Sequence, residues 1–233
     1  DTHYALGSVL HHVCLHQSVV GLEAREQLAS IDETPDTVIA CAGGGSNFAG
    51  LAAPFVADRL AGREIDFLTV EPTACPTLTR GRYAYDYGDL AGLTPLAAMF
   101  TLGHEFIPAG IHAGGLRYHG MSPLVSGLCR AGLVAARAYD QAEVFDAALL
   151  FTRTEGILPA PESAHAIKAV VDEALRCRET GREAVLLFNL SGHGHFDLGA
   201  YERYLSGGLS DATLPDGELE KQLARLPEAP DPS

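Results

Sequence analysis

The amino-acid sequence predicts an α/β fold in which a mostly parallel sheet is flanked by helices. Three short apolar runs, typical of buried strands, alternate with segments whose apolar residues recur at helical spacing. Two of these runs end at a glycine-containing turn, and ligands of such sheets bind where the strands end. The 233 residues, 47% of them hydrophobic, suffice for one large domain or two small ones.

The first half of the chain contains two of the predicted strands. Apolar spacing predicts a helix over residues 4–29, and the run PDTVIACA at 35–42 predicts a buried strand. A second helix is expected from Asn47 to Leu60, followed by a strand over residues 64–70. Residues 79–120 are rich in Gly, Tyr and His, and the stretch 111–123 is too irregular for a long element. Loops of this length are often functional, although a plain surface connection would explain the stretch equally.

The second half continues the alternation. Helices are expected over residues 122–132 and 140–152, and a further helix begins at Pro161 and ends at Gly181. The run EAVLLFNL at residues 183–190 predicts the third strand. A short amphipathic pattern suggests one more helix near the C-terminus.

The composition changes near residue 206, where Gly, Asp, Glu and Pro become frequent. We therefore expect one α/β domain over residues 1–205 and a polar, mobile tail over residues 206–233. The short helix of this tail is expected at about residues 218–226. The chain begins at Asp1 without an initiator Met, and we expect residues to precede it.

The charge balance restricts the partners of this chain. Sixteen basic and 30 acidic residues give a net charge of −14, which argues against nucleic acid or an anionic membrane as partner. No apolar stretch is long enough to span a bilayer, and the N-terminus lacks the pattern of a signal peptide. The 5 cysteines form no close pairs, as in proteins of a reducing compartment, so a cytoplasmic location is expected.

The segment CAGGGSNFAG, residues 41–50, joins the first predicted strand to the second predicted helix. Its glycines let amide N–H groups turn toward a ligand, and the helix N-terminus adds partial positive charge, so the loop is a candidate anion site. Phe48 occupies the position of the third glycine of a dinucleotide loop, and no Gly-Lys-Ser/Thr follows. A single phosphate held by amides and by the Ser46 hydroxyl remains, although close packing would also explain the glycines.

The segment SGHGHFD, residues 191–197, follows the last predicted strand. Because parallel strands end at the same edge of a sheet, this loop and the glycine loop could line one cleft. His193, His195 and Asp197 offer a metal site as an alternative, since His-x-His is a plausible zinc pair. No further ligand is evident, and we predict no metal site.

Several motifs together resemble the tryptophan synthase β chain, over about residues 4–204. The ending HGHFD, where the common β chain reads RGDKD, is more similar to the stand-alone second type of β chain. The resemblance implies a fold-type II enzyme of pyridoxal 5′-phosphate (PLP), with a mostly parallel twisted sheet flanked by helices. The motifs that carry it are GGGSN at 43–47, HAGGLRYHGMSP at 112–123, TEGILPAPESAHA at 154–166 and NLSGHGHFD at 189–197.

The resemblance also implies roles for individual residues. Ser191 would lie beside the pyridine nitrogen, where a hydroxyl leaves the nitrogen largely neutral and suits β-elimination. Glu155 matches the family's Glu beside the ring and is the predicted catalytic residue. Arg117 stands where the common type has an Asp that engages the substrate hydroxyl, so the donor and acceptor preferences stay open. The residues expected to cradle the cofactor phosphate are Gly43, Gly44, Gly45, Ser46 and Asn47.

The implied reaction replaces the hydroxyl of L-serine with indole and gives L-tryptophan and water. It requires a lysine that forms a Schiff base with the cofactor, which in this family precedes the glycine loop. Lys168, in a predicted helix, and Lys221, in the tail, do not match that position. The resemblance therefore implies the C-terminal portion of the enzyme, with an N-terminal half in cis or in trans. It further implies a homodimer, with an α chain and a monovalent cation as additional expectations.

Two other functions stay open on the sequence alone. One is another fold-type II lyase, such as a serine or threonine dehydratase or a cysteine synthase. The other is a half-enzyme that binds PLP or phosphate but performs no chemistry, which the missing lysine favours.

Overall fold

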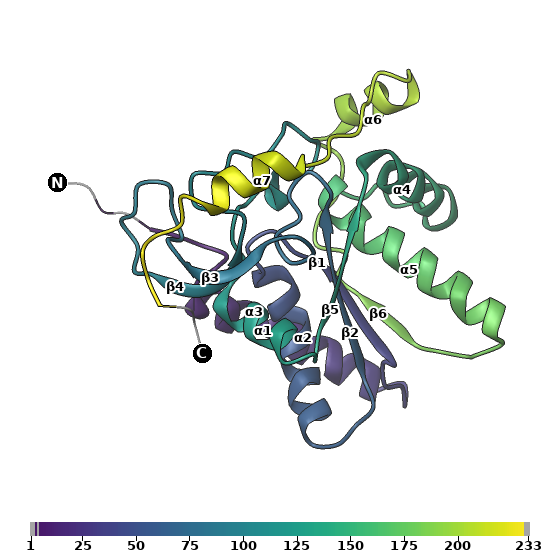
Figure 1. The fold of residues 1–233 in the computed structure, drawn as a ribbon. Helices are drawn as coiled ribbons and strands as arrows, with labels where there is room; N and C mark the ends of the chain where they lie inside the picture. The colour runs from purple at the N-terminus through teal and green to yellow at the C-terminus, as the bar shows by residue number, and fades with distance from the viewer. Residues whose placement is uncertain (1–2, 4, 231–233) are drawn as a thin grey trace.

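A four-stranded parallel sheet forms the centre of the protein, as the computed structural model of residues 3 and 5–230 shows (Figure 1). The spatial order of the strands is β5-β2-β1-β6, and each neighbouring pair is parallel. The predicted α/β class and the parallel sheet are therefore confirmed. The strands are β1 (Thr37–Cys41), β2 (Asp66–Pro72), β5 (Ala135–Tyr139) and β6 (Leu186–Phe188).

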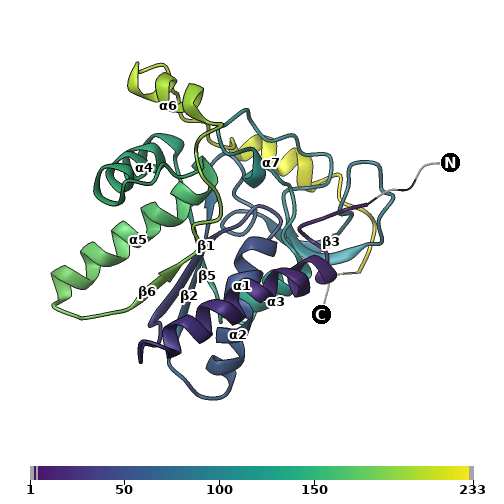
Figure 2. The same cartoon turned by 180° about the vertical axis from the view of Figure 1, so that it is seen from behind.

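Helices cover both faces of this sheet (Figures 1 and 2). Successive side chains of a strand point to opposite faces, so Val38 and Ala40 of β1 pack into one apolar cluster and Ile39 and Cys41 into the other. Burial on both faces explains why these strands are continuous apolar runs. The helices on the Val38 side are α1 (His11–Ala29), α2 (Ser46–Leu60) and α3 (Pro123–Arg130), and those on the Ile39 side are α4 (Gln141–Glu155) and α5 (Pro161–Thr180).

The region rich in Gly, Tyr and His, residues 79–120, contains a second, two-stranded antiparallel sheet. Its strands are β3 (Arg82–Asp86) and β4 (Ala97–Thr101), and a 3-10 turn η1 (Gly114–Leu116) follows. These two strands were not predicted, whereas the expectation that residues 111–123 form no long element is confirmed. Each strand is only five residues long and carries no clear apolar alternation, which left no pattern to recognise.

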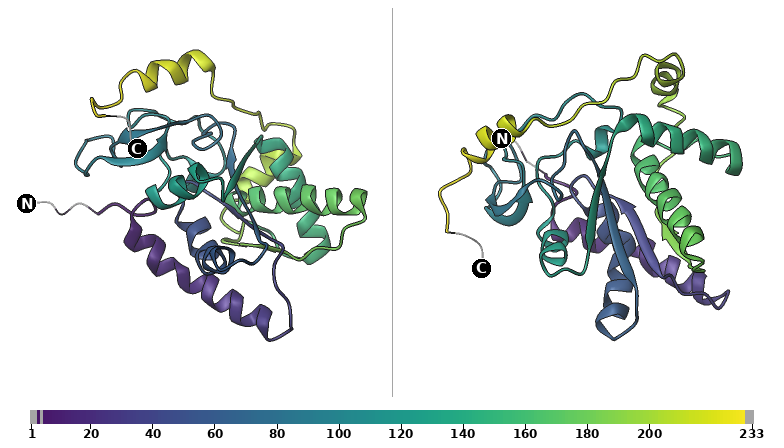
Figure 3. Two further views of the ribbon diagram at one scale, coloured as in Figure 1. Left: turned by 60° about the horizontal axis from the view of Figure 1, so that its bottom comes forward. Right: turned by 45° about the vertical axis from the view of Figure 1, so that its right-hand side comes forward.

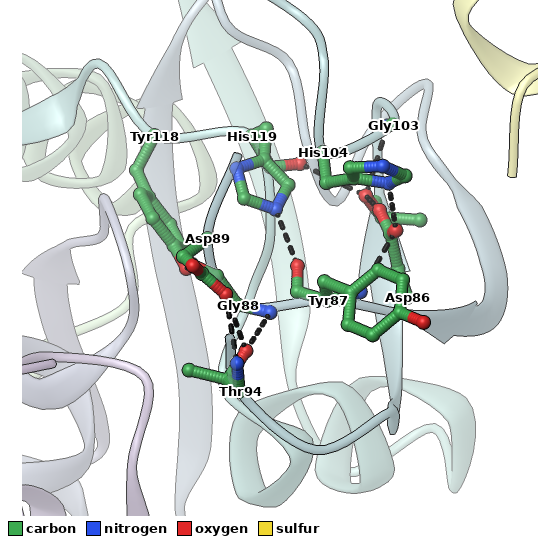
Figure 4. Close-up of polar contacts among 10 residues, drawn as sticks. Asp86, Tyr87, Gly88, Asp89, Thr94, Gly103, His104, Tyr118 and His119 are labelled. Atoms are coloured by element: carbon green, nitrogen blue, oxygen red, sulfur yellow. Dashed lines mark hydrogen bonds and ion pairs between the residues drawn. The ribbon is translucent and has the colours of Figure 1, made fainter. Parts of the chain in front are cut away.

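Buried polar contacts stabilise the β3–β4 hairpin and connect it to His119, just before residues 120–122 (Figure 4). The fully buried Asp86 carboxylate accepts from Thr101 Oγ1 at 2.6 Å and lies 2.6 Å from Nδ1 of His104. His119 Nε2 lies 2.9 Å from the carbonyl oxygen of Tyr87. These contacts hold the backbone before residues 120–122 in place. Met121 and Ser122 in turn pack against Gly45.

Some elements differ from the sequence prediction. Helix α1 begins at His11, because a turn in which the Val9 amide donates to the Gly7 carbonyl oxygen precedes it. Residue 4, where this helix was expected to begin, lies outside the described residues. Strand β5 and helix α6 (Leu198–Leu205) were not predicted, since both are short and weakly patterned.

The C-terminal segment has an apolar inner face. Helix α7 (Asp216–Leu223) lies beside the β3–β4 sheet (Figure 3), close to its predicted position. Leu214 and Leu219 are buried in a small cluster with Leu102 and Phe106, a contact that the polar composition did not reveal. The boundary at residue 205 and the mobility of the tail stay predictions. None of the helices within residues 3 and 5–230 is long and apolar enough to cross a membrane.

Candidate functional site

A cavity of about 600 Å³ lies where strands β1 and β6 end. The glycine loop, residues 43–47, forms one part of its lining, and residues 189–192 after β6 form another. Residues 115–116 of η1 also line it, as do residues at the start of α5 and in α1. The remaining lining residues are Ser8, Gln17, Val20, Cys41, Gly50, Ala160, Glu162 and Ser163. The expectation that the two loops line one cleft is therefore confirmed.

The glycines of the loop are fixed by close packing against neighbouring segments. Gly45 has a φ of 102°, a left-handed conformation that side chains rarely adopt, and a Cβ there would lie 2.9 Å from Met121 Sδ. A Cβ on Gly43 would meet the carbonyl oxygen of Gly115. Close packing therefore accounts for the glycines at these two positions, which was the alternative interpretation of the sequence. Binding of an anion by this loop depends on its backbone amides.

The backbone amides of this loop are available to a ligand. In the part of the chain that the structure describes, no acceptor receives a hydrogen bond from the amides of residues 43–47. Ser46 and Asn47 open α2, whose first amides have no acceptor within the helix and carry its partial positive charge. The Ser46 side chain is buried and lines the same cavity. This arrangement can hold an anion of the size of a phosphate.

The side chain of Asn47 is used within the protein. Its Nδ2 donates to the carbonyl oxygen of Cys41 at 2.9 Å and contacts Cys41 Sγ at 3.3 Å. Its Oδ1 accepts from Nδ2 of Asn189 at 2.7 Å. Asn47 can therefore serve an anion only through its backbone amide, which refines its predicted role in the cradle.

Ser191 lies in the wall of the cavity with two neighbours of different chemistry. Its Oγ is 3.0 Å from Ser163 Oγ and 4.0 Å from Cys41 Sγ. Burial raises the pKa of the Cys41 thiol to about 12, so the thiol stays protonated and is a poor nucleophile. The loop is fixed because the Ala160 amide donates to the Gly192 carbonyl oxygen at 2.9 Å.

The structure does not bring Glu155 to this cavity. Glu155 is the last residue of α4 and is exposed, whereas Glu162, the second residue of α5, lines the cavity. The Glu162 carboxylate accepts from the Gly115 amide at 2.9 Å and so holds η1 at the rim. The sequence correctly predicted a helix beginning at Pro161, which places Glu162 in its first turn, and that position was the signal for a residue at the edge where ligands bind.

Arg117 and the two lysines also lie outside the lining. The Arg117 guanidinium is exposed and donates to the Pro108 carbonyl oxygen at 2.8 Å. Lys168 donates to Asp172 at 2.7 Å, lies 3.5 Å from Glu143, and faces α4. Lys221 is in α7 and largely exposed.

The His-x-His segment shows no arrangement for a metal. The rings of His193 and His195 lie 4.5 Å apart, but among residues 3 and 5–230 no group of three or more His, Cys, Asp or Glu side chains could hold an ion. His165 of α5 is fully buried and is not among the residues that line the cavity.

Several proteins are similar to this chain in sequence. The tryptophan synthase beta chain 2 of Aquifex aeolicus is 62% identical over 215 residues, which are 91% of this chain and 50% of that protein. The protein of the same name from Methanosarcina acetivorans is 59% identical over 90% of this chain and 48% of its own length. The chain thus spans about half the length of the curated relatives it matches.

Solved structures support the same fold. A threonine deaminase of T.th. matches with a TM-score of 0.59 at 22% identity, over 80% of this chain and 53% of the other. An L-serine ammonia-lyase from Rhizomucor miehei matches with a TM-score of 0.62 at 15% identity, over 83% and 56%. Residues 4–192 match the family described as pyridoxal-phosphate dependent enzyme. By this match, which covers more than half of its residues, the chain belongs to the family of pyridoxal-phosphate dependent enzymes.

Proposed function

We propose that this chain holds PLP for an enzyme of the tryptophan synthase β type, which joins L-serine and indole to give L-tryptophan and water. The names of its relatives, at 62% and 59% identity, support the reaction. The observation that carries the proposal is the set of available amides in residues 43–47, which faces Ser191 across one cavity. The amides can donate hydrogen bonds to a phosphate, and the Ser191 hydroxyl can donate one to the basic nitrogen of a heteroaromatic ring.

The residues present fit this cofactor. The amides of residues 43–47 and the Ser46 hydroxyl would hold the phosphate at the N-terminus of α2. Ser191, on the other wall, would donate a hydrogen bond to the ring nitrogen. A hydroxyl of ordinary pKa does not transfer its proton to that nitrogen, so the ring would stay largely neutral, as β-replacement favours. When bound, the cofactor supplies the electron sink that stabilises negative charge at the substrate α-carbon.

We assign the carboxylate of the site to Glu162 in place of Glu155. Its contact with the Gly115 amide at 2.9 Å holds the η1 turn in place, and the carbonyl oxygen of Gly115 backs Gly43. Glu162 would thus fix the rim of the cavity and present negative charge beside the bound ring. Arg117 stays a candidate for substrate selection from outside the lining, in the loop that follows η1.

The lysine that attaches the cofactor would come from the half of the relatives that this chain does not cover. Lys168 is paired with Asp172 and Glu143, and Lys221 lies in α7 and is not among the lining residues. We therefore propose that an N-terminal half, in cis or in trans, completes the site. Homodimer formation, an α-chain partner and a monovalent cation belong to the same proposal.

Borohydride reduction tests this function directly. The chain is incubated with PLP, alone and with a polypeptide matching the uncovered half of the Aquifex relative, then reduced and mapped by peptide mass. We expect a pyridoxyl label on a lysine of the added polypeptide, together with formation of tryptophan from serine and indole. Lys168→Met serves as the control and should leave the label unchanged.

The same experiment separates the alternatives. Turnover with sulfide but not with indole would replace the proposal with a cysteine synthase, and ammonia release from serine alone would replace it with a dehydratase. PLP binding without label or turnover in the mixture would favour a half-enzyme that performs no chemistry. Absence of PLP binding by both the chain and the mixture would refute the proposal.

A further inference from the structure

Ser163 and Ser191 form a hydroxyl pair in the wall of the cavity. Their Oγ atoms are 3.0 Å apart, although the residues are 28 positions apart and belong to α5 and to the loop after β6. Ser163 is fully buried, whereas Ser191 is exposed toward the cavity. Ser163 therefore has no surface open to solvent, and Ser191 lies between its hydroxyl and the open part of the cavity.

The distances indicate which hydroxyl donates. A serine hydroxyl has one proton and two acceptor positions, so Ser163 can donate either to Ser191 Oγ at 3.0 Å or to the Gly192 carbonyl oxygen at 3.3 Å. Hydrogen bonds between hydroxyl and oxygen span about 2.5–3.0 Å, which favours the first. The Gly192 carbonyl oxygen already accepts from the Ala160 amide at 2.9 Å.

This choice decides where the Ser191 proton points. If Ser163 donates to Ser191 Oγ, its proton lies between the two oxygens. The Ser191 proton then points elsewhere and can be donated to an acceptor in the cavity. If Ser163 donates to Gly192 instead, Ser191 would donate to Ser163 and turn its proton away from the cavity. Cys41 Sγ, at 4.0 Å from Ser191 Oγ, is protonated and already contacts Asn47 Nδ2 at 3.3 Å, so it is a weak competitor.

We propose that Ser163 is a positioning residue that donates its proton to Ser191 and so directs the Ser191 hydroxyl proton toward a ring nitrogen bound in the cavity. The identity of the ring rests on the proposed function, since PLP would supply the nitrogen. The direction of the hydrogen bond between the two serines does not depend on PLP, and it can be measured without the cofactor.

A thiol placed at position 191 reports whether Ser163 donates to that position. In Ser191→Cys, a donated hydrogen bond from Ser163 stabilises the thiolate and lowers the pKa of the new thiol. Adding Ser163→Ala removes the donor, so alkylation by iodoacetamide at a pH below that pKa should slow by about threefold to tenfold. Peptide mapping separates this thiol from the native ones, and the titratable groups near it, the Glu162 carboxylate and the protonated Cys41 thiol, are the same in both variants.

Two controls keep this test decisive. Ser206→Ala removes an exposed helix-end hydroxyl that bonds to the Arg203 carbonyl oxygen, and it should leave the alkylation rate unchanged. Ser163→Cys keeps a weaker donor and should give an intermediate rate, which covers the case in which the alanine variant does not fold. An unchanged or faster rate in Ser163→Ala would show that Ser163 donates to Gly192 and would overturn the proposal.

A double-mutant cycle then connects the pair with the cofactor. PLP affinity, measured by equilibrium dialysis, should fall about threefold to tenfold in Ser163→Ala and should not fall further when Ser163→Ala is added to Ser191→Ala. Full additivity would contradict action through Ser191. Failure of the unmodified chain and of its mixture with the N-terminal half to bind PLP would refute the proposed function, while the alkylation result would still decide the role of Ser163.

Discussion

Asn189 donates a hydrogen bond from Nδ2 to Oδ1 of Asn47 at 2.7 Å, and this bond joins the two loops that face each other across the cavity. Asn47 opens α2, and Asn189 directly follows β6. The side-chain amide of Asn47 also donates to Cys41 at the end of β1, so both its donor and its acceptor are satisfied. The side chain thus ties together three backbone segments that must keep their relative positions for one ligand to touch both walls.

The Asn47 contacts predict the effect of a charge-changing isostere. Asn47→Asp keeps the size of the side chain but places a carboxylate oxygen against the Cys41 carbonyl oxygen, to which it cannot donate. We expect a loss of about 1–3 kcal/mol in the free energy of unfolding and weaker PLP binding. Urea denaturation and equilibrium dialysis measure the two effects. A variant as stable as the parent would mean that the Asn47–Cys41 contact does not form in solution.

The left-handed conformation of Gly45 predicts a second effect. Gly45→Ala places a Cβ at a φ of 102° and within 2.9 Å of Met121 Sδ, so it should cost about 2–4 kcal/mol and abolish PLP binding. Gly127→Ala is the matched control, because Gly127 lies inside α3 with nothing within 4 Å of the added Cβ. It should stabilise the protein by roughly 0.5–1 kcal/mol. Equal effects on melting temperature would contradict the geometry of the loop.

Sequence reasoning located the elements whose patterns are local. The apolar runs predicted three of the four parallel strands, and the glycine loop and Ser191 met in one cavity because both follow strands of the same sheet. Strand β5, with the sequence AARAY, pairs with β2 at the sheet edge and has a mixed exposure that no alternation announces. Tertiary pairing, and not its own pattern, makes it a strand.

The site residues were predicted less completely for a related reason. Motif position suggested Glu155, but the left-handed Gly156 ends α4 and leaves Glu155 exposed, while Glu162 reaches the cavity from the next helix. Ser163 and Asn189 had no motif role at all, since their importance depends on hydrogen bonds between segments far apart in sequence. Such contacts follow from the arrangement of the sheet, and one sequence does not specify them.

The buried His165 predicts a pH dependence of stability. Burial is the main cause that lowers its pKa from 6.5 to about 4, and its Nδ1 lies 2.8 Å from the Pro161 carbonyl oxygen. The unfolded chain therefore binds a proton more tightly than the folded one, so stability is complete above pH 6.5 and is lost progressively as the pH falls toward 4. The lowered pKa of His165 therefore changes the free energy of unfolding by about 3 kcal/mol in total, as the size of the pKa shift implies.

The comparison with His165→Gln isolates this contribution from the other histidines. The variant cannot take up a proton at this position, so the difference in unfolding free energy between parent and variant should shrink by about 3 kcal/mol from pH 7 to pH 4. Urea denaturation at several pH values measures it. Parallel pH profiles would show that His165 is protonated equally in both states.

The ion pairs of Lys168 predict a structural effect without a functional one. Its ammonium contacts Asp172 of α5 at 2.7 Å and Glu143 of α4 at 3.5 Å, so it links the two helices. It also lies 5.1 Å from the centre of the Tyr139 ring. Lys168→Met keeps the length of the side chain and removes the charge, so we expect a loss of about 1 kcal/mol in unfolding free energy. PLP affinity, measured by equilibrium dialysis, should not change. A large loss of affinity would place this lysine in the site.

Packing of α7 on the β3–β4 region predicts how the C-terminal segment behaves. Leu219 is buried beside Leu102 and Phe106, and the Arg80 guanidinium bonds to both the Leu214 carbonyl oxygen and Asp216. Leu219→Ala should therefore loosen α7, with a loss of about 1–3 kcal/mol. Hydrogen exchange of the α7 amides should accelerate in this variant while the exchange of β1 amides stays unchanged.

Leu205→Ala provides the control for this experiment, because Leu205 is 65% exposed at the end of α6 and should contribute little. Rapid exchange of α7 in the parent protein, unaltered by Leu219→Ala, would support the mobile tail expected from composition. Slow exchange in the parent that becomes fast in Leu219→Ala would show that the apolar inner face holds the segment. The exchange rates therefore show whether the segment is mobile, as its polar composition suggests, or is held in place by its buried leucine. Both are features of α7, since its polar surface and its buried leucine lie on opposite faces of the helix.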